Sequence, residues 1–196
     1  PLGEVHPWYV LIELASGEPG AAEAAMERLL GKALDDGLIR DAAVAQSKAQ
    51  AKAFWSIREN QSPGQKPEGA TWKHDVSVPV SRVAEFLDQA TARMEALVPG
   101  ARVTAFGHMG DGNIHYDVIR PDGGDNAVHS ALRADGSRIV HDIVASMGGS
   151  ISAEHGLGSM KTEEARRYKS PVEVAALTAI RQSLDPKRIM NPRVLF

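Results

Sequence analysis

Two strand-like segments, 102–107 and 113–119, are joined by only the five residues HMGDG at 108–112. A connection between parallel strands needs about a dozen residues or more, so these two strands must pair as an antiparallel hairpin. Helix and strand patterns alternate along the chain, and several other connections are equally short. The sequence therefore favours an antiparallel or mixed sheet covered by helices on one face over a doubly wound parallel sheet.

Hydrophobic periodicity places the remaining elements. It predicts further strands at 8–14, around 38–45 and at 72–78. Helices are expected over 22–33, from Ser47 to before Pro63, over 81–97, over 126–147 and from Ser170 to about Leu184. A loop is expected at 62–69. Capping boxes, Ser47 with Gln50 and Ser170 with Glu173, mark two of the helix starts.

Composition narrows the classes of function. The chain contains no cysteine, which excludes disulfide scaffolds, thiolate metal sites and cysteine nucleophiles, so a metal would need His, Asp or Glu ligands. A net charge of −3 lacks the excess of positive charge that is typical of nucleic-acid-binding proteins. The longest apolar runs are too short for a transmembrane helix. The N-terminal sequence has no Met and no targeting pattern, so we expect a cytoplasmic protein and a segment of a longer polypeptide.

Seven histidines are present, and the densest polar motif is FGHMGDGNIHYDV at 106–118. Period-two alternation puts Asn113, His115 and Asp117 on one strand face, and the glycine turn can fold His108 back toward His115. Glu154, in SAEHGLG at 152–158, could complete a two-histidine, one-carboxylate metal site. The alternative is that these histidines are hydrogen-bonded strand ends and Glu154 is a surface carboxylate.

Two further patterns need interpretation. GHMGDG resembles a nucleotide loop, but a strand follows it instead of a helix, so we exclude nucleotide binding there. Arg58, with Ser62 one turn later and Lys73 on the polar face of the strand at 72–78, could clamp an anionic substrate. The alternative is that Arg58 and Lys73 are solvated surface cations.

Three motifs in the same order, FGHMGDGNIH, SAEHGLG and LDPKRIMNP, carry a resemblance to a known family. The chain resembles, over its whole length, the C-terminal region of FAD-dependent D-2-hydroxy acid dehydrogenases of the vanillyl-alcohol-oxidase fold group. FWSIREN and WKHDVSVP look closest to the branch that oxidises D-2-hydroxyglutarate. Other members of the group act on D-lactate or glycolate.

The resemblance implies roles for individual residues. The two motif histidines and the motif glutamate would bind a divalent metal, usually zinc, which assigns His108, His115 and Glu154. His155 would be the general base. Arg58, Ser62 and Lys73 would hold the substrate carboxylate. The remaining implied contacts are substrate contacts from Asn113 and Asp117 and an approach of Asn191 to the flavin.

Two of these positions depart from the pattern of the D-2-hydroxyglutarate branch. Ser62 replaces a threonine, and Asp117 replaces an asparagine near the substrate. A carboxylate at position 117 favours substrates without a second carboxylate.

The combined prediction is an α+β fold with a ferredoxin-like antiparallel sheet covered by helices. Residues 1–150 would form a substrate (cap) domain, and residues 151–196 a C-terminal helical segment that packs back on an FAD-binding domain outside these residues. The chain alone is not expected to bind FAD. The expected partners are a small 2-hydroxy acid and an electron acceptor for reduced flavin, with no nucleic acid, and a homodimer is left open.

The expected reaction converts a D-2-hydroxy acid into a 2-oxo acid. The metal would lower the pKa of the substrate hydroxyl, and His155 would take its proton as the Cα hydride passes to the flavin. Two rivals remain. One is a stand-alone metallohydrolase that uses the same three ligands, and the other is a non-enzymatic, ferredoxin-like ligand-binding module.

Overall fold

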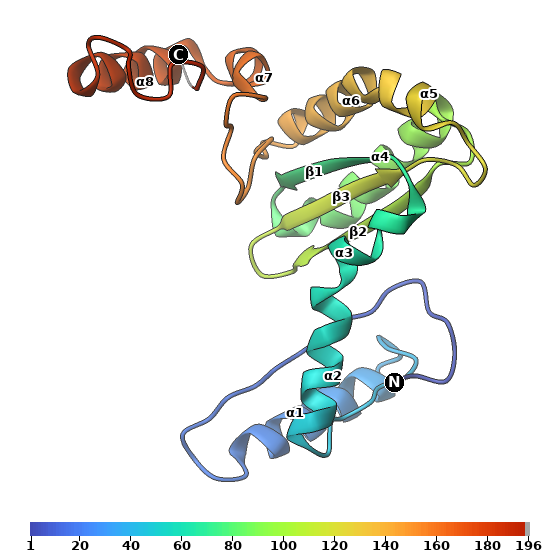
Figure 1. Ribbon diagram of the computed structural model, residues 1–196. Coiled ribbons are helices and arrows are strands. Elements are labelled where there is room, and N and C mark those ends of the chain that lie inside the picture. Colours follow the sequence, from blue (N-terminus) through green and yellow to red (C-terminus); the bar gives the residue numbers. More distant parts are fainter. Residues whose placement is uncertain (195–196) are drawn as a thin grey trace. The chain divides into compact units, whose positions relative to one another are not determined.

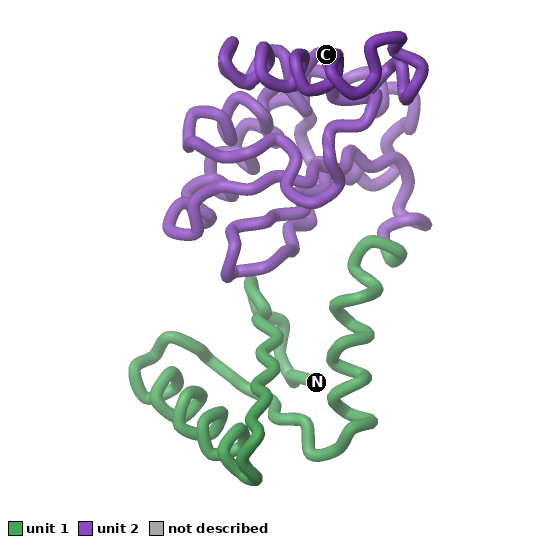
Figure 2. Tube along the Cα trace, turned by 90° about the vertical axis from the view of Figure 1, so that its left-hand side faces the viewer, with its two compact units in different colours: residues 1–64 green, residues 65–196 purple. Residues whose placement is uncertain are grey.

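The computed structural model describes residues 1–194. The chain divides into two compact units, one of residues 1–64 and one that begins at Gln65 (Figure 2). The first unit contains three helices: α1 (Ala21–Asp35), α2 (Lys48–Glu59) and α3 (Gln61–Gly64). The cap domain predicted for residues 1–150 and the segment predicted for 151–196 stay predictions.

The second unit holds the sheet (Figure 1). Its elements, in chain order, are η1 (Lys66–Glu68), β1 (Thr71–Ser77), η2 (Val80–Arg82), α4 (Val83–Leu97), β2 (Arg102–His108), β3 (Asn113–Ile119), α5 (Asn126–Ala131), α6 (Arg133–Ser146), α7 (Thr162–Tyr168) and α8 (Pro171–Leu184).

The sheet has the strand order β1-β3-β2, and both pairings are antiparallel. With α4 between β1 and β2, and with α5 and α6 after β3, the order follows a ferredoxin-like β-α-β-β-α pattern. In a ferredoxin-like fold a fourth strand would pair with β1. Among the described residues, only a single antiparallel bridge between Ser77 and Ser150 stands at that position. The predicted α+β fold with an antiparallel sheet is therefore confirmed.

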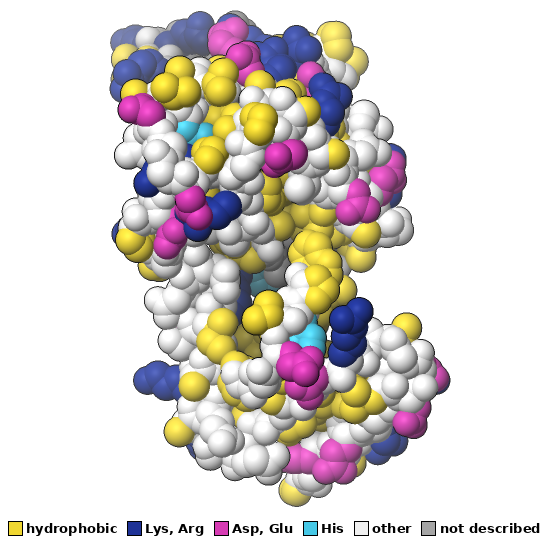
Figure 3. Space-filling model, turned by 90° about the vertical axis from the view of Figure 1, so that its right-hand side faces the viewer, with side chains coloured by type: hydrophobic (Ala, Val, Ile, Leu, Met, Phe, Trp, Pro, Cys, Tyr) yellow, Lys and Arg dark blue, Asp and Glu magenta, His cyan; other side chains and the backbone are white. Residues whose placement is uncertain are grey.

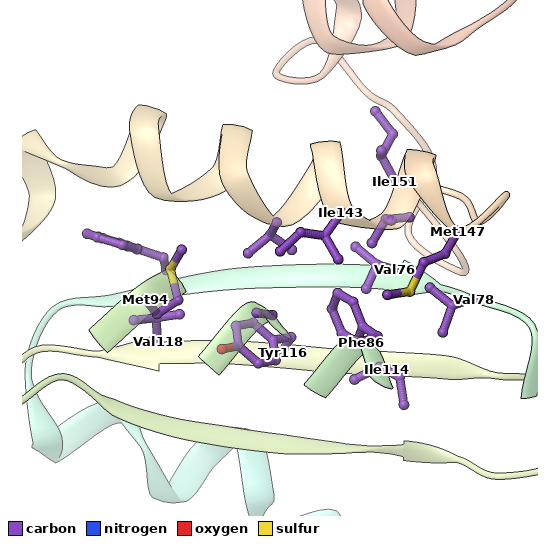
Figure 4. Close-up of a cluster of buried hydrophobic side chains, with 14 of the residues drawn as sticks. Val76, Val78, Phe86, Met94, Ile114, Tyr116, Val118, Ile143, Met147 and Ile151 are labelled. Atoms are coloured by element: carbon purple, nitrogen blue, oxygen red, sulfur yellow. The ribbon is translucent and has the colours of Figure 1, made fainter. Parts of the chain in front are cut away.

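The hydrophobic core lies between one face of the sheet and helices α4 and α6 (Figure 4). Alternation along β1 directs Trp72, His74 and Val76 into this core, where all three are buried, and leaves Lys73 exposed on the opposite face. Further core side chains come from the other strands and from both helices: Phe86, Met94, Ile114, Tyr116, Val118, Val140, Ile143, Val144 and Met147.

Two predicted strands, at 8–14 and 38–45, are absent from the described structure, and these predictions were wrong. A strand is stable only when a neighbour pairs with its backbone groups, and none of residues 1–64 is in a strand. None of these residues is buried either, and Trp8 remains 63% exposed. Exposed apolar side chains are common on the molecule (yellow in Figure 3). Residues 8–14 therefore have the apolar composition of a buried strand, but no neighbouring strand pairs with them.

The helices follow the predictions more closely. The helix expected over 126–147 is interrupted at Leu132 and forms α5 and α6. The loop expected at 62–69 contains most of α3 and all of η1. Helix α7 was not predicted because its sequence, TEEARRY, has almost no apolar pattern. Contacts with α6 hold it instead, since Glu164 accepts from Arg138 at 2.6 Å and from His141 at 2.9 Å.

None of the helices within residues 1–194 has the length and apolar character needed to span a bilayer.

Candidate functional site

The face of the sheet opposite α4 and α6 carries polar side chains from adjacent strands. Antiparallel register places Lys73 opposite Asp117, Asp75 opposite His115 and Ser77 opposite Asn113. Directly opposed residues in a sheet share a face, so the polar sides of β1 and β3 coincide. The sequence predicted the polar side of each strand separately, and the structure joins them.

The β2–β3 turn sets the position of His108. The Asp111 carboxylate accepts a hydrogen bond from the Asn113 backbone N–H at 2.9 Å, and Gly112 adopts a φ of 72°. A side chain at Gly112 would also collide with the Val78 carbonyl, so glycine is required on two grounds. The resulting register pairs His108 with Asn113 and makes it a diagonal neighbour of His115 on the same face.

The loop after α6 brings Glu154 and His155 to this face. Its first anchor is the Ser77–Ser150 bridge, whose two backbone hydrogen bonds measure 2.8 and 2.9 Å. The backbone N–H groups of Glu154 and His155 then both donate to Asp75 Oδ2, at 2.9 and 2.8 Å. One buried carboxylate in β1 thus fixes two residues that are almost eighty positions later in the sequence.

These contacts create a compact cluster of histidines and carboxylates. His115 Nε2 lies 3.7 Å from a Glu154 carboxylate oxygen, and His115 Nδ1 lies 3.9 Å from Asp75 Oδ1. His155 Nδ1 lies 3.7 Å from Asp75 Oδ2, and the rings of His155 and His115 stack at 5.4 Å. Ligand atoms of Asp75, His115 and His155 all lie within 4.8 Å of one another, a spacing that could hold a metal ion.

The electrostatics keep Asp75 ionised. Burial by itself raises the pKa of this carboxyl, but the backbone N–H groups of His155 and Glu154, the His155 side chain and the Asn113 amide outweigh it, so the pKa is lowered. Lys161 lies close enough to Asp75 to interact electrostatically, although burial dominates and lowers the Lys161 pKa. A negative charge is therefore held beneath the histidines at neutral pH.

Asp117 is a second buried carboxylate on the same face, with 1% exposure. Its Oδ2 lies 3.9 Å from Lys73 Nζ. Burial raises the pKa of Asp117, and Gln65 and Lys73 compensate only in part. Lys73, which the sequence assigns to a substrate carboxylate, therefore already faces a carboxylate of the protein.

Asn113 combines two features of a binding residue. Its amide nitrogen donates to Asp75 Oδ1 at 3.2 Å, whereas its buried Oδ1 has no hydrogen-bond partner among the described residues. It also lines a small pocket together with Ser77, Asp111, Ala153 and Glu154. An unpaired acceptor in a pocket can receive a hydroxyl hydrogen bond from a ligand.

Most of the predicted site residues belong to the second compact unit. Contacts join His115 to Glu154 and to His155, and the strand register places His108 on the same face as His115. Arg58 lies in α2 and Ser62 in α3, both within the first compact unit. Asn191 has a φ of 45°, and its carbonyl accepts a hydrogen bond from Arg181 at 3.0 Å. The roles assigned to these residues stay predictions.

Comparisons with known proteins give the family. The family model described as "FAD linked oxidases, C-terminal domain" matches residues 1–195. The chain belongs to this family. The C-terminal domain is 35% identical over 196 residues to a D-2-hydroxyglutarate dehydrogenase of Xanthomonas citri pv. viticola. The matched residues cover 100% of this chain and 41% of the relative.

Eukaryotic relatives give the same result. The C-terminal domain is 35% identical over 192 residues to the mitochondrial D-2-hydroxyglutarate dehydrogenase of Arabidopsis thaliana, with 98% of this chain and 33% of the relative covered. It is 33% identical over 187 residues to the Bos taurus enzyme of the same name, with 95% and 33% covered. The chain thus spans about two fifths or less of these relatives, and the predicted family resemblance is confirmed.

Sequence reasoning missed Asp75 as a member of the site. A signal was present, because aspartate is disfavoured within strands and the alternation of WKHDVSV put it beside Lys73 on the polar face. The strand pattern could not show which groups the Asp75 carboxylate contacts. Those partners, the backbone N–H groups of the 152–158 loop, become visible only in the tertiary structure.

Proposed function

We propose that this C-terminal domain is the substrate-binding part of an FAD-dependent dehydrogenase that oxidises a D-2-hydroxy acid to the 2-oxo acid. The observation that carries the proposal is the convergence of His115, Glu154 and His155 around Asp75 on the polar face of the sheet. The names of the relatives, D-2-hydroxyglutarate dehydrogenases, support the reaction class. FAD would be bound mainly by a further domain, and an electron acceptor would reoxidise it.

The donor set fits a divalent metal. His115 has only 14% of its side chain exposed, and its Nε2 faces the Glu154 carboxylate. Imidazole and carboxylate donors suit zinc and similar ions. We therefore propose His115 and Glu154 as ligands, with His108 as the third ligand by resemblance. In the complete enzyme the flavin would supply the hydride acceptor, and the metal a Lewis acid.

The residues of the chain perform the remaining steps. His155 accepts the proton of the substrate hydroxyl at Nε2, because its Nδ1 faces Asp75. The Asn113 Oδ1 and Lys73 Nζ would contact the polar groups of the substrate. Arg58 and Ser62 would complete the carboxylate clamp. Loss of that proton to His155 would balance the two-electron oxidation, because the flavin, when bound, would supply the acceptor for the hydride.

The preferred substrate depends on Asp117. Its buried carboxylate faces Lys73 and repels a second substrate carboxylate, so we propose a preference for monocarboxylate or hydroxylated 2-hydroxy acids. Asp117→Asn should shift the ratio of kcat/KM values toward D-2-hydroxyglutarate relative to D-lactate. A wild-type preference for D-2-hydroxyglutarate, or an unchanged ratio in the variant, would contradict this assignment.

The central experiment uses the protein in the longest form that its gene encodes. We expect about one equivalent of divalent metal and anaerobic bleaching of the flavin by a D-2-hydroxy acid. His115→Ala should lose both the metal and the bleaching, whereas the control His6→Ala should keep them. Equal metal content in His115→Ala would refute the metal site. Hydrolysis without flavin would instead support a metallohydrolase, and wild-type protein that contains no metal and turns over no substrate would support the non-enzymatic, ferredoxin-like ligand-binding module.

The cytoplasmic location also stays a prediction. The relatives from plants and animals are named as mitochondrial, whereas the bacterial ones carry no compartment in their names. A homodimer likewise remains open.

A further inference from the structure

Asp75 occupies the centre of the site but has no assigned role in the proposed mechanism. It lies in the middle of β1 and has 3% exposure. Its carboxylate is close to the side chains of Asn113, His115 and His155. A buried carboxylate is costly unless hydrogen bonds satisfy it. Its contacts therefore indicate what it does.

Three hydrogen bonds satisfy the Asp75 carboxylate. Oδ2 accepts the backbone N–H groups of Glu154 and His155, and Oδ1 accepts the Asn113 amide. The Asp75 carbonyl also accepts the Ala153 N–H at 3.3 Å. Asp75 is therefore the anchor that fixes the loop with the proposed ligand and the proposed base against the sheet.

The same carboxylate faces the same ring atom of two histidines. His115 Nδ1 lies 3.9 Å from Oδ1, and His155 Nδ1 lies 3.7 Å from Oδ2. A carboxylate favours the neutral imidazole tautomer whose N–H points toward it. The separations exceed hydrogen-bond length, as is common for functional contacts in ligand-free sites. With Nδ1–H held toward Asp75, the Nε2 lone pair of each ring points away from the carboxylate.

We propose that Asp75 is a shared positioning residue that selects the Nδ1–H tautomer of both His115 and His155 and fixes the Glu154–His155 backbone. For His115 this frees Nε2 as a metal ligand beside Glu154. For His155 it frees Nε2 to accept a proton. The benefit to metal binding and catalysis rests on the proposed function, whereas the tautomers and the loop anchor do not.

Direct ligation by Asp75 is the competing arrangement, since one ligand atom from each of Asp75, His115 and His155 lies within 4.8 Å of the other two. Two observations favour positioning. Oδ2 already accepts two backbone N–H groups at short distances, which uses its lone pairs. In addition, the Nε2 atom of His115 faces the half-exposed Glu154, whereas its Nδ1 faces the buried Asp75.

The Asp75→Asn variant separates the two parts of the proposed role, which are the anchoring of the Glu154–His155 backbone and the selection of the histidine tautomers. Its side-chain oxygen can still accept the N–H groups of Glu154 and His155, while its amide nitrogen faces Asn113 and His115. Asn113 can adapt because its own Oδ1 is unpaired and becomes the acceptor after an amide flip. His115 Nδ1 then faces a donor, which favours the Nε2–H tautomer, so a metal that binds at Nε2 must first restore the less favoured Nδ1–H tautomer, and its affinity falls while its ligands stay the same.

The experiment compares Asp75→Asn and Asp75→Ala in the longest form of the protein that its gene encodes. Side-chain ¹⁵N NMR of histidine-labelled, metal-free protein reports the tautomers, and amide hydrogen exchange at residues 154 and 155 reports the anchor. We expect Nδ1–H for both histidines in the wild type, Nε2–H for His115 in Asp75→Asn, and retained exchange protection. Asp75→Ala should lose the protection as well.

Zinc affinity, measured by chelator competition, should fall roughly 10–100-fold in Asp75→Asn. The matched control is Asp125→Asn, because Asp125 also accepts two backbone N–H groups, at the start of α5, and should leave zinc affinity unchanged. If Co²⁺-loaded Asp75→Asn shows an altered d–d spectrum at saturating metal, Asp75 is a direct ligand and the proposal is overturned.

An unchanged His115 tautomer in Asp75→Asn, or unprotected 154 and 155 amides in the wild type, would likewise overturn it. Failure of the proposed function has a different signature. In that case the wild-type protein binds no metal or reduces no flavin, but the Nδ1–H tautomers and the amide protection still respond to Asp75 as described.

Discussion

Arg58 lies near the end of α2, one turn before Ser62 in α3. If its guanidinium holds the substrate carboxylate through two parallel hydrogen bonds, Arg58→Ala should raise KM far more than the control Arg28→Ala on α1. Lysine cannot reproduce a planar two-point contact, so Arg58→Lys should be impaired as well. Steady-state kinetics with the preferred 2-hydroxy acid measure this. An unchanged KM in Arg58→Ala would instead support the alternative that Arg58 is a solvated surface cation.

His155 is the proposed base, and its side chain is 66% exposed above Asp75. His155→Asn should retain FAD and metal but slow flavin reduction by about 10²-fold or more, the scale expected for loss of a positioned base. Stopped-flow reduction is the measurement, and Ser159→Ala in the neighbouring loop is the control. Reduction at the wild-type rate would show that His155 is only structural.

At the scale of elements, α8 depends on its N-terminal cap. The Ser170 hydroxyl accepts the Glu173 N–H at 3.2 Å, and the Glu173 carboxylate accepts the Ser170 N–H at 2.9 Å. None of the residues of α8 is buried, so local interactions carry much of its stability. Ser170→Ala should destabilise the helix by about 1 kcal/mol.

Amide hydrogen exchange along α8 checks this prediction, since faster exchange reports local opening. Ser183→Ala in the last turn of the same helix is the control and should not accelerate exchange, because alanine has the higher helix propensity. Equal exchange in Ser170→Ala and wild type would mean that contacts outside the cap hold the helix.

At the scale of the whole molecule, buried histidines tie stability to pH. His74 is 2% exposed, donates from Nδ1 to the Tyr116 carbonyl at 2.8 Å and accepts at Nε2 from the Ser137 hydroxyl at 3.0 Å. Burial lowers its pKa from 6.5 to about 4. Between these values the unfolded chain binds a proton that the native state does not, so the free energy of unfolding falls as the pH drops.

The loss attributable to His74 is about 3 kcal/mol between pH 6.5 and pH 4, with no further loss from this group below pH 4. Urea denaturation across this range should show the slope, and His74→Gln should flatten it. Burial also lowers the pKa values of His129 and His141, so part of the slope should remain in the variant. An identical slope in both proteins would rule out His74 as the source.

The sequence alone was sufficient wherever the determinant is local. Strand β3, helix α4 and the capped helix α8 follow from periodicity and from residues within a few positions. The polar face of β3, with Asn113, His115 and Asp117, follows from the period of two. The motifs that carry the family resemblance are likewise contiguous, and the family was identified from them.

Only the tertiary structure decided which distant segments meet. It joined Asp75 in β1 to Glu154 and His155, a contact invisible in either motif, because hydrogen bonds between remote backbone and side-chain groups leave no spacing pattern. It also decided against a strand at 8–14. An apolar run fixes the tendency to be extended, whereas the strand itself requires a partner whose backbone groups pair with it, and residues 1–64 contain none.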